Sequence, residues 1–296
     1  MMNQNADQNM TGLIDRATAG DKESLETLIA GVQDLVFNLS LRMLGTFPDA
    51  EDAAQDILLK VITHLSSFKR DSLFSTWVFR IATNHLINYK KHMFAHASLT
   101  FEYYGDDIEN APVTEIPDLT QNVDRELLAE ELKMSCTNVM LQCLDPESRC
   151  IFVLGTMFRL DSRVAGEILG LTPEAYRKRL SRIRRKMADF LTEYCGEYGN
   201  GRCRCANRLN YAIQSHRLNP GSLDYTSQTV RSGETGNPEE TDIPREAKLD
   251  FIRAMDEIDN LSSHFTFCRM YRSPERIRQF FRDFLESPAL TVVKNT

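Results

Sequence analysis

The sequence lacks the segments that mark a secreted or membrane-spanning protein. Residues 1–10 are polar and lack the basic-then-apolar pattern of a signal peptide. No apolar run approaches the ~18–20 residues that are needed to span a bilayer. The seven cysteines are an odd number, and without a secretion signal a disulfide framework is not expected. We therefore expect a cytoplasmic protein.

Strand-like alternation and internal repeats are also missing, and helical periodicity dominates instead. Apolar residues recur at helical spacing over 21–44, with Asp49 as the expected cap of a second helix and a third helix over about 75–91. A second helical segment spans 124–194, and two further helices are predicted at 246–268 and 274–286. The pattern predicts an all-α protein of more than one domain.

Charge of one sign is absent from one long segment. Residues 94–124 hold seven acids and no Lys or Arg, whereas seven of the ten residues in 177–186 are basic. The net charge of −7 argues at first against a nucleic-acid-binding protein, but the asymmetry means that charge has to be considered segment by segment. Punctuated by Gly105, Pro112 and Pro117, the acidic segment is expected to be an extended linker, with a disordered spacer as the alternative.

The clearest local motif is a helix-turn-helix at 161–188. Gly170, Leu171 and Thr172 form the expected turn, because Gly170 tolerates a positive φ and Thr172 can cap the next helix. The second helix places four apolar side chains inward (Tyr176, Leu180, Ile183, Met187) and leaves a basic face outside.

That basic face is the candidate DNA-binding surface. We expect base or groove contacts from Arg177, Lys178 and Ser181, because the first turns of such a helix enter the major groove. Phosphate contacts are expected from Arg182, Arg184 and Arg185. The full candidate set is Thr172, Glu174, Arg177, Lys178, Ser181, Arg182, Arg184 and Arg185. The alternative is a solvated basic face on a structural helix.

Two motifs upstream of the helix-turn-helix resemble a known family. Residues 49–56 read DAEDAAQD and resemble the polymerase-binding helix of sigma-70 family factors. Residues 74–84 read FSTWVFRIATN and resemble the promoter-melting and −10 recognition segment of that family. The matching parts cover about residues 20–92 and 124–192. Without an N-terminal inhibitory region or a middle domain, the chain resembles the compact extracytoplasmic-function (ECF) group.

The resemblance implies two helical sigma domains joined by an acidic linker, with a mostly helical C-terminal extension. Region 2 would span 12–93, the linker 94–123, region 4 with the helix-turn-helix 124–194, and the Cys-containing extension 195–296. In the family the linker threads through the polymerase channel. The implied partners are core RNA polymerase (its β′ and β subunits), promoter DNA and an anti-sigma factor, with no catalytic chemistry.

The resemblance also implies residue roles. Polymerase binding is expected from Asp49, Glu51, Asp52, Gln55, Asp56 and Leu59; these acids would otherwise be read as an ordinary solvated helix face. Recognition of the −10 element is expected from Lys69, Arg70, Phe74, Trp77, Arg80, Asn84, Asn88, Lys90 and Lys91, which offer positive charge and aromatic platforms. Trp77 is favoured as a core aromatic, and for Phe74 the two roles stay open. The basic helix at 173–188 would recognise the −35 element.

Three cysteines lie close together in the extension. Cys195, Cys203 and Cys205, with His216 eleven residues further on, can supply four zinc ligands, although the spacing is not one of the common paired patterns. Reduced thiols or a redox-sensitive pair are the alternative. The stretch resembles a cysteine-rich extension of some compact sigma factors, where it is thought to tune activity. Whether the helices at 246–268 and 274–286 pack on the sigma domains or bind a partner stays open.

Two other functions fit parts of the sequence. A helix-turn-helix regulator that binds duplex DNA without polymerase explains residues 161–188 but leaves the motifs at 49–56 and 74–84 unexplained. A zinc enzyme would use the cysteine stretch but lacks a nearby Glu-His constellation or another general base.

Overall fold

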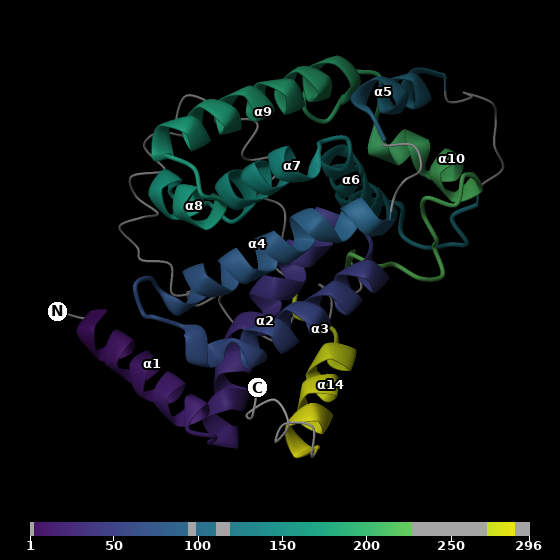
Figure 1. The fold of residues 1–296 in the computed structure, drawn as a ribbon. Coiled ribbons are helices and arrows are strands. Elements are labelled where there is room, and N and C mark those ends of the chain that lie inside the picture. The colour runs from purple at the N-terminus through teal and green to yellow at the C-terminus, as the bar shows by residue number, and fades with distance from the viewer. Residues whose placement is uncertain (1–2, 94–98, 111–118, 227–270, 288–296) are drawn as a thin grey trace. The chain divides into compact units, whose positions relative to one another are not determined.

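The computed structural model describes residues 3–93, 99–110, 119–226 and 271–287 (Figure 1). In these ranges every regular element is helical, apart from an isolated β-bridge between Cys195 and Cys203. The all-α prediction is therefore confirmed for the described residues, none of whose helices is long and apolar enough to cross a membrane. The chain forms two units, residues 1–89 with 270–296, and residues 90–269.

The first unit is built mainly from the N-terminal third of the chain. Its elements are α1 (Asn3–Thr18), α2 (Lys22–Leu44), α3 (Phe47–Thr63), the 3-10 turn η1 (Leu65–Ser67), α4 (Phe74–Met93) and α14 (Glu275–Glu286). Helix α2 begins after Asp21, whose carboxylate accepts a hydrogen bond from the Ser24 amide at 3.1 Å. It ends at Gly45, where the backbone turns left-handed. The helices predicted at 21–44 and 75–91 are found, whereas α1 was not predicted.

The start of α3 differs from the prediction that Asp49 caps it. Thr46 is the cap: its hydroxyl accepts a hydrogen bond from the Asp49 amide at 3.3 Å and donates one to the Asp49 carboxylate at 2.6 Å. Asp49 is the third residue of the helix, in the position that pairs back to the cap. The helix begins three residues earlier than a cap at Asp49 would allow, because proline is tolerated in the first turn.

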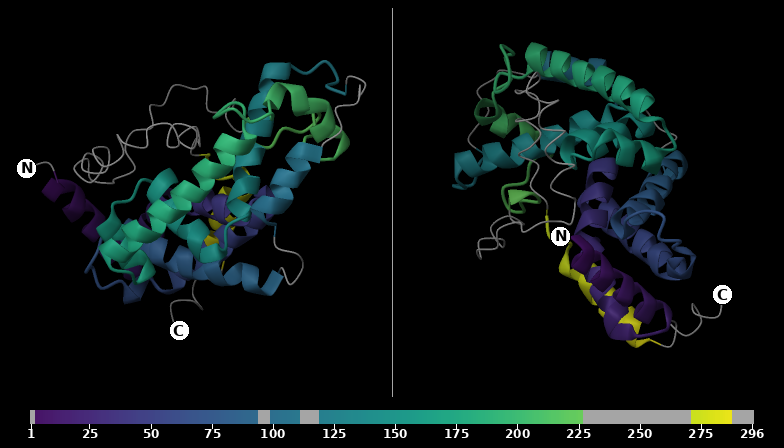
Figure 2. Two further views of the ribbon diagram at one scale, coloured as in Figure 1. Left: turned by 90° about the horizontal axis from the view of Figure 1, so that it is seen from above. Right: turned by 90° about the vertical axis from the view of Figure 1, so that its left-hand side faces the viewer.

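Helix α14 packs against α2 and α3. In Figure 2 it appears in yellow beside the purple helices of the first unit. Its apolar face, Ile277, Phe281 and Leu285, is buried. Ahead of it, the Asn38 side chain donates to the Tyr271 carbonyl at 2.7 Å and accepts from the Tyr271 amide at 2.9 Å. The sequence left open whether the helix predicted at 274–286 packs on the rest of the chain or binds a partner. The structure shows that this helix, α14, packs on the first unit. The helix predicted at 246–268 lies outside the described residues.

The second unit contains the helix-turn-helix. Its elements are α5 (Phe101–Asn110), α6 (Arg125–Gln142), α7 (Pro146–Phe152), the π-turn η2 (Val153–Met157), α8 (Ser162–Leu169), α9 (Pro173–Tyr194), η3 (Cys205–Arg208) and α10 (Leu209–Gln214). Arg149 is buried and donates to the carbonyls of Leu141 and Leu144, both at 2.7 Å, which satisfies the C-terminal end of α6.

Part of the acidic linker is helical, which corrects the prediction of an extended segment for residues 101–110. The aromatic rings of Phe101 and Tyr104 pack on Phe190 of α9, with centroids 5.2 Å and 5.5 Å apart. Burial of these two side chains stabilises a helix that local composition does not favour. The segment that was predicted to be an extended linker therefore contains a helix, α5, that packs on α9.

The predicted extension of residues 195–296 is divided between the two units. Leu209, Ala212 and Leu218 form a small core with Leu128 of α6. The buried Glu131 carboxylate accepts hydrogen bonds from the amides of residues 224–226 at 2.7–2.9 Å. Residues 195–226 thus belong to the second unit, whereas 271–287 belong to the first.

Candidate nucleic-acid interface

The turn between α8 and α9 is formed as the sequence predicts. Gly170 ends α8 in the left-handed region at φ 66°, and the Leu171 amide donates to the Gly166 carbonyl at 2.8 Å. Thr172 then caps α9 by accepting a hydrogen bond from the Ala175 amide at 3.2 Å. Pro173 occupies the first helical position. These contacts hold the N-terminus of α9 in a defined direction.

The inward face of α9 anchors the helix in the unit. Tyr176, Leu180, Ile183 and Met187 are all buried, as predicted. The Tyr176 hydroxyl donates to the Ile151 carbonyl at 2.9 Å, so this buried polar group is satisfied. The opposite face of α9 is consequently free to present its charged side chains to solvent.

Seven of the eight predicted DNA-contacting residues of this motif lie on that exposed face: Thr172, Glu174, Arg177, Lys178, Ser181, Arg182 and Arg185. Three of them make local contacts: Arg177 donates to the Ser162 hydroxyl at 2.9 Å, and Lys178 pairs with Glu174 at 2.7 Å. Exposed ion pairs of this kind contribute little to stability and exchange readily for phosphate oxygens.

Arg184 departs from the predicted phosphate contact. The residue is 9% exposed, and its guanidinium donates to the Thr156 hydroxyl and the Gly155 carbonyl, each at 3.1 Å. Burial lowers the pKa of this guanidinium from its ordinary value. Arg184 therefore ties α9 to the π-turn η2, and its donors are directed into the unit instead of toward DNA.

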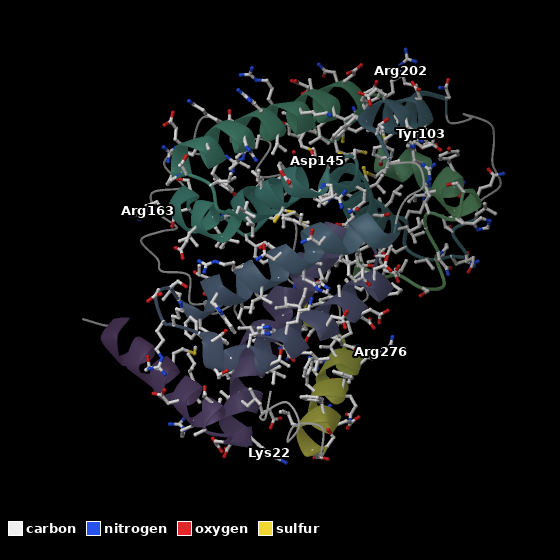
Figure 3. All side chains as sticks on the ribbon, in the orientation of Figure 1. Lys22, Tyr103, Asp145, Arg163, Arg202 and Arg276 are labelled. Carbon is white, nitrogen blue, oxygen red and sulfur yellow. The ribbon has the colours of Figure 1, made fainter. Side chains whose placement is uncertain are left out.

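Two exposed arginines were missing from the predicted set. The Arg163 side chain at the start of α8 is 84% exposed and points outward in Figure 3. Arg179 on α9 is exposed, with a long contact of 4.0 Å to Glu147. The run of basic residues at 177–186 already contained Arg179, but Arg163 carried no signal apart from its place in the first helix of the motif.

In the first unit, three aromatic rings gather at the start of α4. Phe68, Phe74 and Trp77 lie with ring centroids 5.3–5.7 Å apart, and the planes of Phe74 and Trp77 are nearly parallel at 28°. Phe74 is 6% exposed, whereas Trp77 is half-buried. Phe74 therefore takes the core role that was left open. Trp77, which was favoured as a core residue, keeps part of its ring accessible.

Polar and basic side chains surround this aromatic cluster. Lys69 and Arg70 are exposed in the loop before α4, where Arg70 has a left-handed backbone (φ 63°) and its guanidinium pairs with Asp15. Asn84 and Asn88 are exposed along α4, and Arg80 is half-buried. Lys90 and Lys91 belong to α4, but their side chains lie outside the described residues.

The predicted polymerase-binding residues lie along α3. Asp52 and Asp56 are exposed, and Asp49, Gln55 and Leu59 are partly so. Glu51 differs from the other acids, because Arg276 of α14 approaches its carboxylate at 3.6 Å and leaves the side chain 18% exposed. Burial raises the pKa of Glu51, which the Arg276 charge partly offsets.

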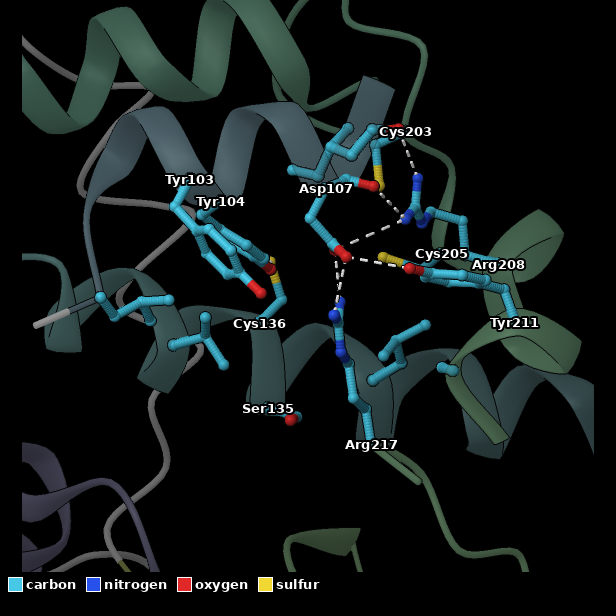
Figure 4. A pocket seen from close by; sticks show the side chains of 15 residues that line it. Tyr103, Tyr104, Asp107, Ser135, Cys136, Cys203, Cys205, Arg208, Tyr211 and Arg217 are labelled. Atoms are coloured by element: carbon cyan, nitrogen blue, oxygen red, sulfur yellow. Dashed lines mark hydrogen bonds and ion pairs between the residues drawn. The ribbon is translucent and has the colours of Figure 1, made fainter. Parts of the chain in front are cut away.

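The cysteines of the extension lie near a cavity of about 330 Å³ between α5, α6 and residues 203–217 (Figure 4). Cys136, Cys203 and Cys205 line it, together with Tyr104 and Asp107. The Tyr104 hydroxyl donates to the Cys136 sulfur at 3.0 Å. Burial raises the pKa of Cys205 to about 12 and also raises that of Cys203, so these thiols are protonated at neutral pH.

The predicted zinc ligands are only partly brought together. Cys195 and Cys203 face each other across the β-bridge, whereas His216 is exposed and does not line the cavity with Cys203 and Cys205. Among the described residues, no three His, Cys, Asp or Glu side chains are grouped to hold a metal ion. Zinc binding by Cys195, Cys203, Cys205 and His216 stays a prediction that this arrangement does not support. The six described cysteines are free thiols.

Comparison with known proteins shows likeness over parts of the chain. A family model described as Sigma-70 region 2 matches residues 28–92. The chain is 27% identical over 185 residues to the ECF RNA polymerase sigma factor SigW of Bacillus subtilis, covering 61% of this chain and 95% of that protein. It is 34% identical over 84 residues to the RNA polymerase sigma-H factor of Pseudomonas aeruginosa, covering 28% of this chain and 42% of that protein.

Two further similarities are more limited. The ECF RNA polymerase sigma factor SigE of Mycolicibacterium smegmatis is 26% identical over 174 residues, covering 59% of this chain and 64% of that protein. Among solved structures, CnrH in complex with the cytosolic domain of CnrY is 23% identical with a TM-score of 0.44, covering 60% of this chain and 94% of that chain. The chain thus spans nearly the full length of one relative and less than two thirds of the other two curated relatives.

Proposed function

The chain belongs to the sigma-70 family, in its ECF group of RNA polymerase sigma factors, and we propose that its two units divide the work of promoter-specific transcription initiation. In this proposal the first unit binds core polymerase and the −10 element, and the second unit binds the −35 element. The protein acts as a polymerase subunit with no catalytic chemistry of its own. The alternative of a regulator that works without polymerase leaves the region 2 match unexplained.

The observation that carries the −35 role is the two-sided construction of α9. One side is buried through Tyr176, Leu180 and Met187, and the other presents Arg177, Arg182 and their neighbours to solvent. A helix that is fixed on one side by a tight turn and is basic on the other fits the major groove of duplex DNA. Arginine and lysine there neutralise phosphates, and arginine near the helix N-terminus can pair with guanine.

The −10 role is supported by the half-exposed Trp77 ring beside the basic loop of Lys69 and Arg70. Bases that are freed from a duplex stack on aromatic rings while cations hold the backbone. Trp77 is already supported by Phe68 and Phe74, so its exposed surface is held at a fixed orientation. We expect Asn84 and Asn88, one and two turns along α4 from Arg80, to extend this surface.

The polymerase role is assigned to the exposed acids of α3. Asp52 and Asp56 lie one helical turn apart and present their carboxylates on the same face. We propose that a basic helical element of the β′ subunit pairs with them, with further contacts to the β subunit. Glu51 is a weaker candidate, because Arg276 already neutralises it. An anti-sigma factor that competes for this surface is the remaining predicted partner.

Two pairs of variants separate the proposed roles. We expect Arg177→Ala with Arg182→Ala to weaken transcription that depends on the −35 element while core polymerase is still bound. We expect Asp52→Ala with Asp56→Ala to weaken binding to core polymerase, and transcription with it, while the basic face of α9 is unaltered. Loss of a base-specific pair should cost about 1–3 kcal/mol.

The readouts are pull-down with core polymerase and in vitro transcription from promoters mapped on host DNA. Arg202→Ala and Glu26→Ala remove an exposed charge of the same sign elsewhere in each unit and serve as matched controls. Tight, specific duplex binding by the protein without polymerase would favour the regulator instead. Equal core binding by all variants would contradict the assignment of Asp52 and Asp56.

A further inference from the structure

The linker helix α5 is held between region 4 and the C-terminal extension. On one side its Phe101 and Tyr104 rings pack on Phe190. Its backbone also lies directly on the Tyr194 ring, because a Cβ added to Gly105 would be 2.6 Å from a carbon of that ring. A larger residue at position 105 would force the end of the Tyr194 side chain to shift, so α5 lies in close contact with the end of α9.

On its other side, α5 is bound by the C-terminal extension through the carboxylate of Asp107. Arg217 donates two hydrogen bonds to Asp107, one of them 2.7 Å long, and the Tyr211 hydroxyl donates a third at 2.9 Å (Figure 4). Arg208 donates to the Ile108 carbonyl at 2.8 Å. These contacts join residues about a hundred positions apart in the chain, and the charge-assisted ones are the strong kind. Asp107 is therefore the point at which the extension holds the linker.

The surface on which α5 lies is incompletely filled, and it combines apolar side chains with the polar contacts to Asp107. A cavity of about 330 Å³ that is partly open to solvent adjoins α5, α6 and the extension. Release of α5 therefore has to break the bonds to Asp107 and to expose the rings of Phe101 and Tyr104.

We propose that residues 203–217 act as an intramolecular clamp that keeps the linker on the region 4 unit, and that engagement of core polymerase requires the clamp to open. The inference rests on the proposed function, because only a sigma factor has to deliver this linker to the enzyme. In the family the linker enters the polymerase channel, and this linker cannot do so while α5 is held by Arg208 and Arg217. The extension therefore lowers the affinity of the free protein for core polymerase by competing for its own linker.

The clamp is tested by loosening it in the full chain. Arg217→Gln combined with Tyr211→Phe removes three of the bonds to Asp107, and Arg202→Gln on the exposed part of the extension is the matched control. We expect faster amide hydrogen exchange over residues 103–110 and an affinity for core polymerase that is higher by about fivefold or more, the lower end of typical coupling between sites. Tyr211→Phe alone keeps every carbon atom and serves if the double variant does not fold.

Each outcome decides between distinct conclusions. Unchanged exchange in α5 would mean that the Asp107 contacts do not hold the helix, which overturns the clamp. Faster exchange with unchanged polymerase affinity would overturn it as well, because holding α5 would then carry no consequence for binding. If neither the unaltered protein nor the variant with Arg217→Gln and Tyr211→Phe binds core polymerase, the proposed function fails; if both bind it equally, only the clamp fails.

Discussion

Replacing Arg184 should destabilise the second unit, whereas replacing its neighbour Arg182 should weaken DNA binding only. Arg184→Met keeps much of the aliphatic bulk but removes the donors to Thr156 and Gly155. Each hydrogen bond from a charged group contributes ~1.5–3 kcal/mol, and a buried acceptor that is left without a partner costs ~1–3 kcal/mol. Since these contributions overlap, we expect a net loss of about 2–4 kcal/mol in the free energy of unfolding.

The position of the only tryptophan makes this measurable within the full chain. Trp77 lies in the first unit, so its fluorescence reports that unit, while far-ultraviolet circular dichroism reports both. At ~2–4 °C per kcal/mol for a unit of this size, the dichroism transition of the second unit should fall by roughly 5–15 °C. The tryptophan transition should not move.

Arg182→Met is the matched control, because Arg182 is exposed on the same helix. It should leave both transitions in place and reduce promoter binding. If Arg184→Met unfolds at the same temperature as this control, the buried contacts of Arg184 contribute nothing, and the argument from burial is refuted.

Three other predictions follow from single contacts. Gly170→Ala should cost ~1–2 kcal/mol, because its φ of 66° is strained for a residue with a Cβ, and thermal unfolding of the second unit would measure it. Asn38→Leu removes both bonds to the Tyr271 backbone and should release residues 271–287 to protease, whereas unchanged cleavage would argue against the contact. Hydrogen bonds from Arg217 lower the pKa of Asp107, so its contribution is complete above the ordinary value of 3.8 and is lost as the pH falls through the lowered pKa; Asp107→Asn should flatten this acid limb in a pH titration of stability.

The helix-turn-helix was predictable because its signals are local. Gly170 and Thr172 mark the turn by their own conformational preferences, and Tyr176, Leu180 and Met187 mark the buried face by spacing. Arg184 shows the limit of assigning residues by type. It lies four residues after Leu180 and three before Met187, which places it on the buried side, although its charge suggested an exposed role.

The docking of α5 and α14 could not be predicted from periodicity. The contacts that hold Asp107 span about a hundred residues, and those of Asn38 with Tyr271 span 233. No window of sequence contains both partners. Amphipathicity indicated that residues 274–286 form a helix, but only long-range geometry identifies the surface that it covers.

The pairing of Asn38 with Tyr271 has a consequence for biosynthesis. The ribosome makes Asn38 long before Tyr271, and at ~5–20 residues per second the 233 intervening positions take about 10–50 s. During that interval the surface of α2 and α3 that packs against α14 is not yet covered by this helix. In a nascent polypeptide the surface of α2 and α3 that binds α14 is therefore exposed for most of its synthesis. The progress of translation sets the moment at which α14 first covers this surface.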